Sequence, residues 1–175
     1  IIPKRFEKIY YHWIDNLHDW CISRQIWWGH RIPVWYKGDD MRVGIEAPDD
    51  GKGWEQDPDT LDTWFSSALW TWSTLIDQDQ ALDMKNSLSD ILKHSPDFQR
   101  YHPTTVLETG YDILFFWVAR MILSTTYVIG DVPFKQVYLH GMVRTREGTK
   151  MSKSKPETTI DPLEIIPEFG ADSLR

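Results

Sequence analysis

Apolar side chains recur every three or four residues in two stretches of the chain. The first set is Phe6, Ile9, Tyr10, Trp13, Leu17 and Trp20, and the second is Leu61, Trp64, Phe65, Ala68, Leu69 and Trp72. Residues spaced in this way share one face of an α-helix, so each set predicts an amphipathic helix that faces a core. Between them, residues 32–36 suit a short strand. Residues 37–58, rich in glycine and acidic side chains, predict a hairpin or loop insertion.

The second half of the chain alternates strand and helix signals. Residues 104–109 predict a buried strand, Gly110 and Tyr111 a tight turn, 112–129 a long apolar helix, and 133–140 a second strand. Asp161-Pro162-Leu163-Glu164 then has the capping residue, proline and acidic residue that begin a helix. This order predicts an α/β fold, a Rossmann-like parallel sheet with flanking helices and right-handed crossovers. The polar stretch 77–100 predicts a surface helix and turn.

Composition narrows the class of protein. A chain of 175 residues with 41% hydrophobic content is one domain by length and can bury a core. The net charge of −7 argues against a general nucleic-acid-binding surface. Cys21 is the only cysteine, which excludes an internal disulfide and a cysteine-rich zinc module and suits a reducing compartment. No apolar stretch approaches the ~20 residues of a membrane span, and no signal peptide is evident. We therefore expect a cytoplasmic protein without membrane contact.

The run Lys150-Met151-Ser152-Lys153-Ser154 is the strongest chemical signal. It lies between the strand that ends at His140 and the helix that begins after Asp161, in a loop with further cations at Arg144, Arg146 and Lys155. Open α/β sheets bind nucleotides at such strand-to-helix connections. Lysine is a compact charge that stabilises phosphoryl oxygens as charge develops on them. A basic pentapeptide alone would more often be a solvated turn.

This run resembles the KMSKS signature of the class I aminoacyl-tRNA synthetases, and further blocks extend the resemblance over nearly the whole chain. They are residues 20–25, 27–36, 59–67 and 108–117. Thr109-Gly110-Tyr111-Asp112-Ile113 resembles the valyl enzymes of the family, whereas the isoleucyl enzymes typically carry a Gly-Ser-Asp-Gln type of sequence there. An isoleucyl enzyme and a non-catalytic, synthetase-derived binding module are the alternatives.

The resemblance implies an ATP-dependent ligase that forms valyl-adenylate and transfers valine to its tRNA. Its partners would be ATP with Mg²⁺, L-valine and the valine tRNA. Lys153, supported by Lys150, would neutralise the triphosphate, with Met151, Ser152 and Ser154 completing the loop at ATP. Some relatives carry a Cys-rich zinc knob after the block at 27–36. Residues 37–57 hold neither cysteine nor histidine, so we expect no structural zinc and no metal site.

Several residues are candidates for the adenylate site. Asp112 follows Gly110 at a strand end, where a carboxylate can accept ribose hydroxyls or cap the next helix, and the resemblance favours ribose or adenylate. His140, Gly141, Met142 and Val143 resemble the loop that holds adenine. His140 could equally be a structural residue at the end of the strand.

The candidate amino-acid pocket consists of Trp64, Ile113 and Trp117. Ile113 and Trp117 are four residues apart and so share a helix face. In the resembled enzymes, the matching positions wall the pocket for the amino-acid side chain. From spacing alone these three residues would more often be core. Arg24, Trp28 and His30 stand in a resembled block without an assigned role, and we expect them to serve packing.

The chain also departs from the family. It lacks the His-x-Gly-His signature, and Lys155-Pro156-Glu157 replaces the usual Gly-Asn pair after the lysine loop, where proline stiffens the exit. The editing and anticodon-binding domains of the resembled enzymes are not recognisable either. We therefore expect residues 1–175 to be the carboxy-terminal half of a catalytic domain, inactive alone, whose missing domains belong to the same polypeptide.

Overall fold

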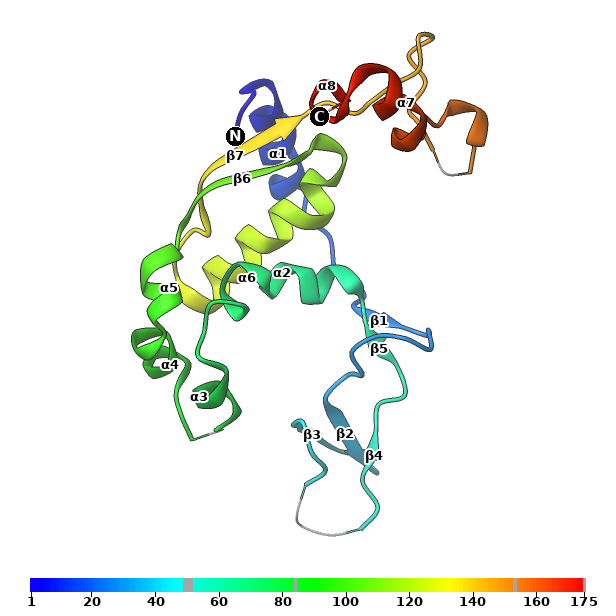
Figure 1. Cartoon of the computed structure of the whole chain (residues 1–175). Coiled ribbons are helices and arrows are strands. Elements are labelled where there is room, and N and C mark those ends of the chain that lie inside the picture. The colour runs from blue at the N-terminus through cyan, green and yellow to red at the C-terminus, as the bar shows by residue number, and fades with distance from the viewer. Residues whose placement is uncertain (49–51, 84, 153, 175) are drawn as a thin grey trace. The chain divides into compact units, whose positions relative to one another are not determined.

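The computed structural model describes residues 1–48, 52–83, 85–152 and 154–174. The chain divides into two compact units, Ile1–Leu139 and His140–Arg175. The first unit contains helices α1 to α6, and the second contains α7 and α8. Figure 1 traces their order along the chain.

A parallel sheet forms the centre of the first unit. Strands β6 (Thr104–Gly110) and β7 (Phe134–His140) are neighbours and run in the same direction, joined by a helical crossover (Figure 1). The amino-terminal Ile2 extends the sheet in parallel, since its N–H donates to the Val137 carbonyl at 2.7 Å and its carbonyl accepts from Leu139 at 2.7 Å. The predicted parallel sheet with flanking helices is confirmed. Leu107, Thr109 and Gly110 are buried but the other residues of β6 are not, so the prediction of a wholly buried strand is wrong.

The crossover helix changes geometry along its length. It begins as a 3₁₀ turn at Tyr111–Ile113, widens to a π-helical stretch at Leu114–Ala119 and becomes α6 over Arg120–Ile129. Gly130 ends it with a φ of 83°, in the left-handed region that glycine adopts without steric cost. The predicted long helix is therefore present, but its first two segments are not α-helical.

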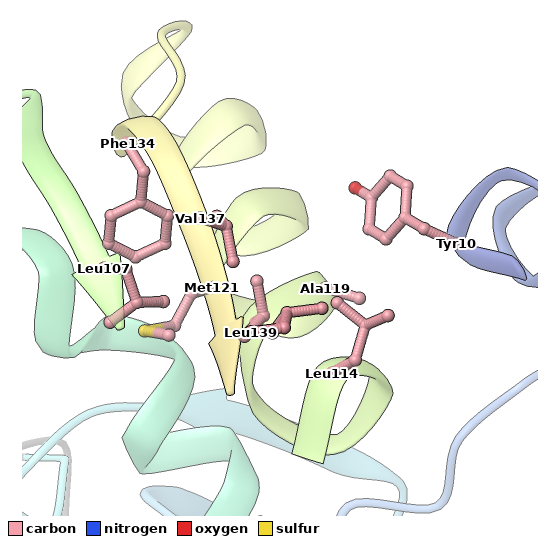
Figure 2. Close-up of a cluster of buried hydrophobic side chains, with 9 residues drawn as sticks. Tyr10, Leu107, Leu114, Ala119, Met121, Phe134, Val137 and Leu139 are labelled. Carbon is pink, nitrogen blue, oxygen red and sulfur yellow. The ribbon is translucent and has the colours of Figure 1, made fainter. Parts of the chain in front are cut away.

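The hydrophobic core is built mainly from this helix and the two parallel strands. Figure 2 shows the cluster, which contains Tyr10, Leu107, Leu114, Val118, Ala119, Met121, Phe134, Val137 and Leu139. Val118, Ala119 and Met121 are fully buried, and Leu114 is 1% exposed. Each fully buried side chain of the size of leucine contributes about 1.5–3 kcal/mol, so this cluster holds the crossover against the sheet.

The same helix corrects one prediction. The stretch Tyr111–Ile129 has 19 residues and a mean hydropathy of 1.5, long and apolar enough by composition to cross a membrane. The expectation that no apolar stretch approaches this length is therefore wrong. Leu114, Val118 and Met121 of this stretch lie in the core of the first unit, whereas Phe116 and Tyr127 are exposed.

Two helices flank the crossover. α1 (Arg5–Asp15) places Tyr10 in the core and ends where the Asn16 side chain donates to the His12 carbonyl at 2.7 Å. Leu17 and Trp20, predicted to continue this helix, lie beyond its end. α2 (Thr63–Ser73) begins at its N-cap Asp62 and is joined to α6 by a buried hydrogen bond between the Thr71 and Thr125 hydroxyls, 2.6 Å long.

Short elements complete the first unit. Three short helices, α3 (Gln78–Leu82), α4 (Leu88–His94) and α5 (Pro96–Tyr101), occupy the stretch predicted to hold one surface helix and a turn. β1 (Ser23–Arg24) pairs antiparallel with β5 (Thr60–Leu61).

A small antiparallel sheet lies between those two paired strands in the sequence. It has the order β3-β2-β4, with β2 at Val34–Lys37, β3 at Asp40–Val43 and β4 at Glu55–Gln56. The Trp35 indole N–H donates to the Gly44 carbonyl at 2.9 Å, and the Lys37 ammonium lies 5.8 Å from the centre of the Trp54 ring. Aromatic side chains thus support this sheet.

The second unit begins after β7 with a turn-rich segment and ends in helices. A 3₁₀ turn at Pro156–Thr158 precedes α7 (Pro162–Phe169) and α8 (Ala171–Leu174). The Asp161 carboxylate accepts from the Leu163 N–H at 2.9 Å. The predicted helix start at Asp161 is confirmed.

Candidate active site

A pocket of about 490 Å³ lies in the first unit between α2 and the irregular turns that precede α6. It is lined by Trp64, Ser66, Ser67, Trp70, Ser73, Thr74, Ile113 and Trp117. The three residues predicted from the sequence to share a pocket, Trp64, Ile113 and Trp117, do line one pocket. They come from two segments about fifty residues apart, which the packing of α2 on the crossover helix brings together.

Aromatic contacts fix the walls of this pocket. The Trp64 ring lies 6.0 Å from that of Phe116, and the Trp70 ring lies 6.1 Å from that of Trp117, both in tilted arrangements. Such separations are typical of favourable aromatic pairs. Each predicted tryptophan is therefore supported by a second ring, and the walls are more rigid than isolated side chains would be.

Sequence reasoning missed the part of the pocket that α2 contributes besides Trp64. Trp70 and the serine hydroxyls of Ser66, Ser67 and Ser73 line it too. Ser67 lies three residues after Trp64, so a helical wheel could have found it. Trp70 contacts Trp117 across the two segments, a contact that no local pattern encodes.

Asp112 lies in the first turn of the crossover. Gly110 is the N-cap residue of this 3₁₀ turn, and Ile113 is the N-cap residue of the stretch that follows it. Asp112 lies inside the turn, and its side chain is exposed. Gly110 is buried at the carboxyl end of β6, beside the Asp112 carboxylate in sequence.

The lysine loop in the second unit begins as a tight hairpin. Arg144 and Lys150 form an antiparallel bridge, and Thr145 accepts from Gly148 and donates to Thr149, each at 2.9 Å. Gly148 has a φ of 82°, so this turn requires glycine. The Arg144 guanidinium donates to the Gly148 carbonyl at 2.7 Å. Hydrogen bonds from its own main chain and from Thr145 lower the pKa of Glu147 in the same turn.

Hydrogen bonds between small side chains shape the rest of the loop. The hydroxyls of Ser152 and Ser154 are 2.9 Å apart, and the Lys155 N–H donates to the Ser152 carbonyl at 2.9 Å. The Thr158 hydroxyl donates to the Lys155 carbonyl at 2.8 Å and accepts from the Ser152 N–H at 3.2 Å. Ser152 and Ser154 thus bind the loop to itself. Lys153 lies outside the described residues.

Pro156 begins the 3₁₀ turn that follows. Its fixed φ suits the first position of a helical turn, and its missing N–H is not needed there. The exit from the lysine loop is therefore a short ordered turn in this chain.

The predicted adenine segment follows β7. His140 is the last residue of the strand, and its Nδ1 lies 2.6 Å from the Gly141 carbonyl. Val143 is exposed, Met142 is half-buried, and a side chain at Gly141 would meet no other atom within 4 Å. Gly141 and Val143 are thus exposed residues, as a contact of this segment with a nucleotide would require.

The described residues contain no group of three or more histidine, cysteine, aspartate or glutamate side chains arranged to hold a metal ion. Cys21, the only thiol in the chain, is exposed, and hydrogen bonds with Ser23 lower its pKa. It has no histidine or lysine among these partners that would mark a catalytic nucleophile.

Comparison with known proteins assigns the chain to a family. The family model for tRNA synthetases class I (I, L, M and V) matches residues 1–52 and 49–175. The chain belongs to the class I tRNA synthetases, and the resemblance recognised in its motifs is confirmed.

Within that family, the chain is similar to valine–tRNA ligases. The chain is 52% identical to the valine–tRNA ligase of Bacillus subtilis over 176 residues and 53% identical to that of Bacillus licheniformis. Each match covers 99% of this chain and 18% of the relative. The chain therefore spans about a fifth of the length of these relatives.

Two solved structures show the same fold at low identity. The LeuRS of Agrobacterium radiobacter K84, in a ternary complex with tRNA and LeuAMS, matches with a TM-score of 0.68 and 23% identity over 97% of this chain and 26% of that one. The methionyl-tRNA synthetase of Mycobacterium tuberculosis, in complex with methionyl-adenylate, matches with a TM-score of 0.59 and 20% identity over 98% of this chain and 27% of that one. The predicted class I synthetase fold is confirmed.

Proposed function

We propose that this chain forms the valine pocket and part of the ATP site of a valine–tRNA ligase, which makes valyl-adenylate and transfers valine to its tRNA. The observation that carries the proposal is the pocket walled by Trp64, Ile113 and Trp117. The shared name of relatives that are about half identical over the whole chain supports valine over isoleucine.

The walls suit a small branched side chain. Two tryptophan faces and an isoleucine offer an apolar surface, and the rings behind them limit how far it can yield. Burying a valine side chain contributes about 1.5–3 kcal/mol. The ring pairs behind Trp64 and Trp117 limit how far these walls can move when a side chain binds. The serine hydroxyls at the edge of the pocket can bind polar atoms of the substrate.

The activation step needs no nucleophile from the protein. A carboxylate oxygen of valine attacks the α-phosphorus of ATP, the new carboxylate–phosphorus bond forms, and the bond to the bridging oxygen breaks as pyrophosphate leaves. Such in-line displacements depend on positioning and electrostatic stabilisation. Lys153, with Lys150 in support, would stabilise the charge that moves onto pyrophosphate. Mg²⁺ accompanies ATP as part of the substrate and neutralises part of its charge.

The remaining contacts would come from other residues of this chain and from further segments of the polypeptide. Asp112 and Gly110 would bind the ribose or adenylate, and the segment from His140 to Val143 would hold the adenine through its main chain. The relatives are several times longer than this chain, so most of the tRNA-binding surface would lie outside these residues. A cytoplasmic location follows from the same proposal.

The test is valine-dependent exchange of pyrophosphate into ATP by the complete enzyme that carries this chain. We expect valine to support exchange far better than isoleucine, leucine or methionine. Stronger exchange with isoleucine would make the chain part of an isoleucyl enzyme. Absence of exchange with every amino acid, in a protein that is folded by circular dichroism, would favour a non-catalytic module.

A further inference from the structure

We propose that the ion pair between Arg24 and Asp62 positions Trp64 in the pocket and thereby sets the selectivity for the amino acid. The proposal rests on the proposed function, because Trp64 is a wall of the valine pocket only if that function holds. Neither Arg24 nor Asp62 lines the pocket itself. Both are therefore positioning residues and not catalytic ones.

Asp62 binds the main chain of Trp64 directly. One of its carboxylate oxygens accepts from the Trp64 N–H at 2.6 Å, and its own N–H donates to the Ile22 carbonyl at 2.7 Å. Asp62 is 6% exposed, so few water molecules reach it. A carboxylate in this environment needs charged or hydrogen-bonding partners, and it transmits any movement to the residue it holds.

Arg24 supplies the opposite charge. One guanidinium nitrogen donates to the second carboxylate oxygen of Asp62, and another donates to the carbonyls of Cys21 at 2.6 Å and Ser23 at 2.7 Å. The guanidinium group is a rigid planar fork, so three acceptors define its orientation. The pairing of β1 with β5 holds the two partners, because Arg24 stands opposite Thr60, two residues before Asp62.

A second set of contacts fixes the ring of Trp64. Its neighbour Phe116 lies 6.0 Å away, and the Arg120 guanidinium lies 5.5 Å from the Phe116 ring and 3.7 Å from the ring of Trp20. Burial lowers the pKa of Arg120, and the nearby carboxylate of Asp62 opposes this effect. The aromatic contacts limit the ring, and the Arg24–Asp62 pair limits the main chain that carries it.

The two restraints act on different atoms of one residue. If the ion pair is lost, the buried Asp62 carboxylate reorients toward water, and the first turn of α2 moves with it. A small displacement of Trp64 changes the room beside the valine methyl groups. In an apolar pocket one methylene group is worth roughly 10- to 200-fold in discrimination. Selectivity should therefore respond before the chemical step does.

The experiment measures activation kinetics of the complete enzyme with Arg24→Ala, Arg24→Lys and Asp62→Asn. Asparagine caps helices about as well as aspartate, so Asp62→Asn keeps the hydrogen bond from Trp64 and removes the charge. We expect Arg24→Ala and Asp62→Asn each to raise the KM for valine about tenfold and to lower the ratio of kcat/KM for valine over isoleucine about tenfold. The KM for ATP should change less than about twofold, and Arg24→Lys should restore part of the selectivity.

Lys93→Ala is the control, because it breaks the exposed Lys93–Asp90 ion pair on α4 and should alter none of these values. Unchanged selectivity in both Arg24→Ala and Asp62→Asn would overturn the proposal. A uniform fall of all rates together with the melting temperature would overturn it too, because that result assigns the pair to folding alone. If the unmodified enzyme does not activate valine, the proposed function fails first, and this outcome is visible before any variant is compared.

Discussion

Replacing Thr125 by valine tests how α2 and α6 are held together, the contact on which the pocket depends. Thr125 is fully buried and Thr71 is 3% exposed, and their hydroxyl oxygens are 2.6 Å apart. Valine keeps the shape of threonine and deletes its hydroxyl, so the Thr71 hydroxyl loses this partner in a dry environment. A buried polar group left in this way costs about 1–3 kcal/mol, so we expect Thr125→Val to destabilise the protein by that amount.

The double variant decides whether the hydroxyl pair is responsible. Replacing both partners by apolar groups of the same shape is nearly neutral. We therefore expect Thr71→Val/Thr125→Val to cost less than about 1 kcal/mol, less than either single variant, with a coupling free energy of at least about 1 kcal/mol. Urea unfolding followed by circular dichroism gives these values, provided the slope of the transition stays constant.

Thr74→Val is the matched control, at the C-cap of the same helix. The Thr74 hydroxyl donates to the Trp70 carbonyl at 2.9 Å on the exposed side of α2, where water can replace the bond. Its loss should change the free energy of unfolding by no more than about 0.5 kcal/mol. If Thr125→Val is equally mild, or if the double variant costs the sum of the singles, the reasoning about the buried pair is refuted.

Three further predictions concern the site and its surroundings. In the complete enzyme, Trp117→Ala should lower kcat/KM for valine by about one to two powers of ten, less than the ~3–5 kcal/mol of a fully buried ring, because Trp117 is half-buried. Unchanged valine kinetics would remove it from the pocket. Lys153→Ala should slow valyl-adenylate formation by about two to three powers of ten with little change in ATP affinity, and Lys150→Ala should slow it less. Pre-steady-state kinetics would contradict this expectation if Lys153→Ala weakened ATP binding but left the rate of valyl-adenylate formation at saturating ATP unchanged. Burial lowers the pKa of His102, so the folded state favours its neutral form. The free energy of unfolding should therefore decrease as the pH falls below about 6.5, the pKa of histidine in the unfolded chain. His102→Phe, which keeps the stacking on Phe98, should weaken this fall between pH 7.5 and 5, and parallel unfolding profiles would refute it.

The order of the parallel elements could be read from the sequence because local signals agree with tertiary packing. Alternation and a terminal glycine marked β7, and Asp161 followed by proline marked the start of α7. Where a contact between distant residues sets the end of an element, the local pattern gave the wrong boundary. Helical spacing continues to Trp20, but α1 ends at Asp15, because Trp20 lies against Arg120 and Phe65 instead.

In the candidate site, too, local motifs identified some residues and missed those that depend on a distant contact. Motifs identified Trp64, Ile113 and Trp117, whereas Trp70 required knowledge of how two segments pack. The sequence did not assign a chemical role to Arg24 or Trp28. Trp28 is 85% exposed, so the expectation of a packing role is wrong for it. Arg24 pairs with Asp62 across thirty-eight positions, a distance over which no periodic pattern acts.

The wide turn at Leu114–Ala119 also limits how this domain can change over time. A π-helical stretch is equivalent to one extra residue in an α-helix, and each α-helical residue turns the chain by about 100°. Losing one residue there would restore regular winding for α6. It would also rotate Ile113 by about 100° around the helix axis relative to the buried face of α6, away from Trp117. Substitutions can adjust the pocket gradually, but insertions and deletions in this turn would abolish it in one step.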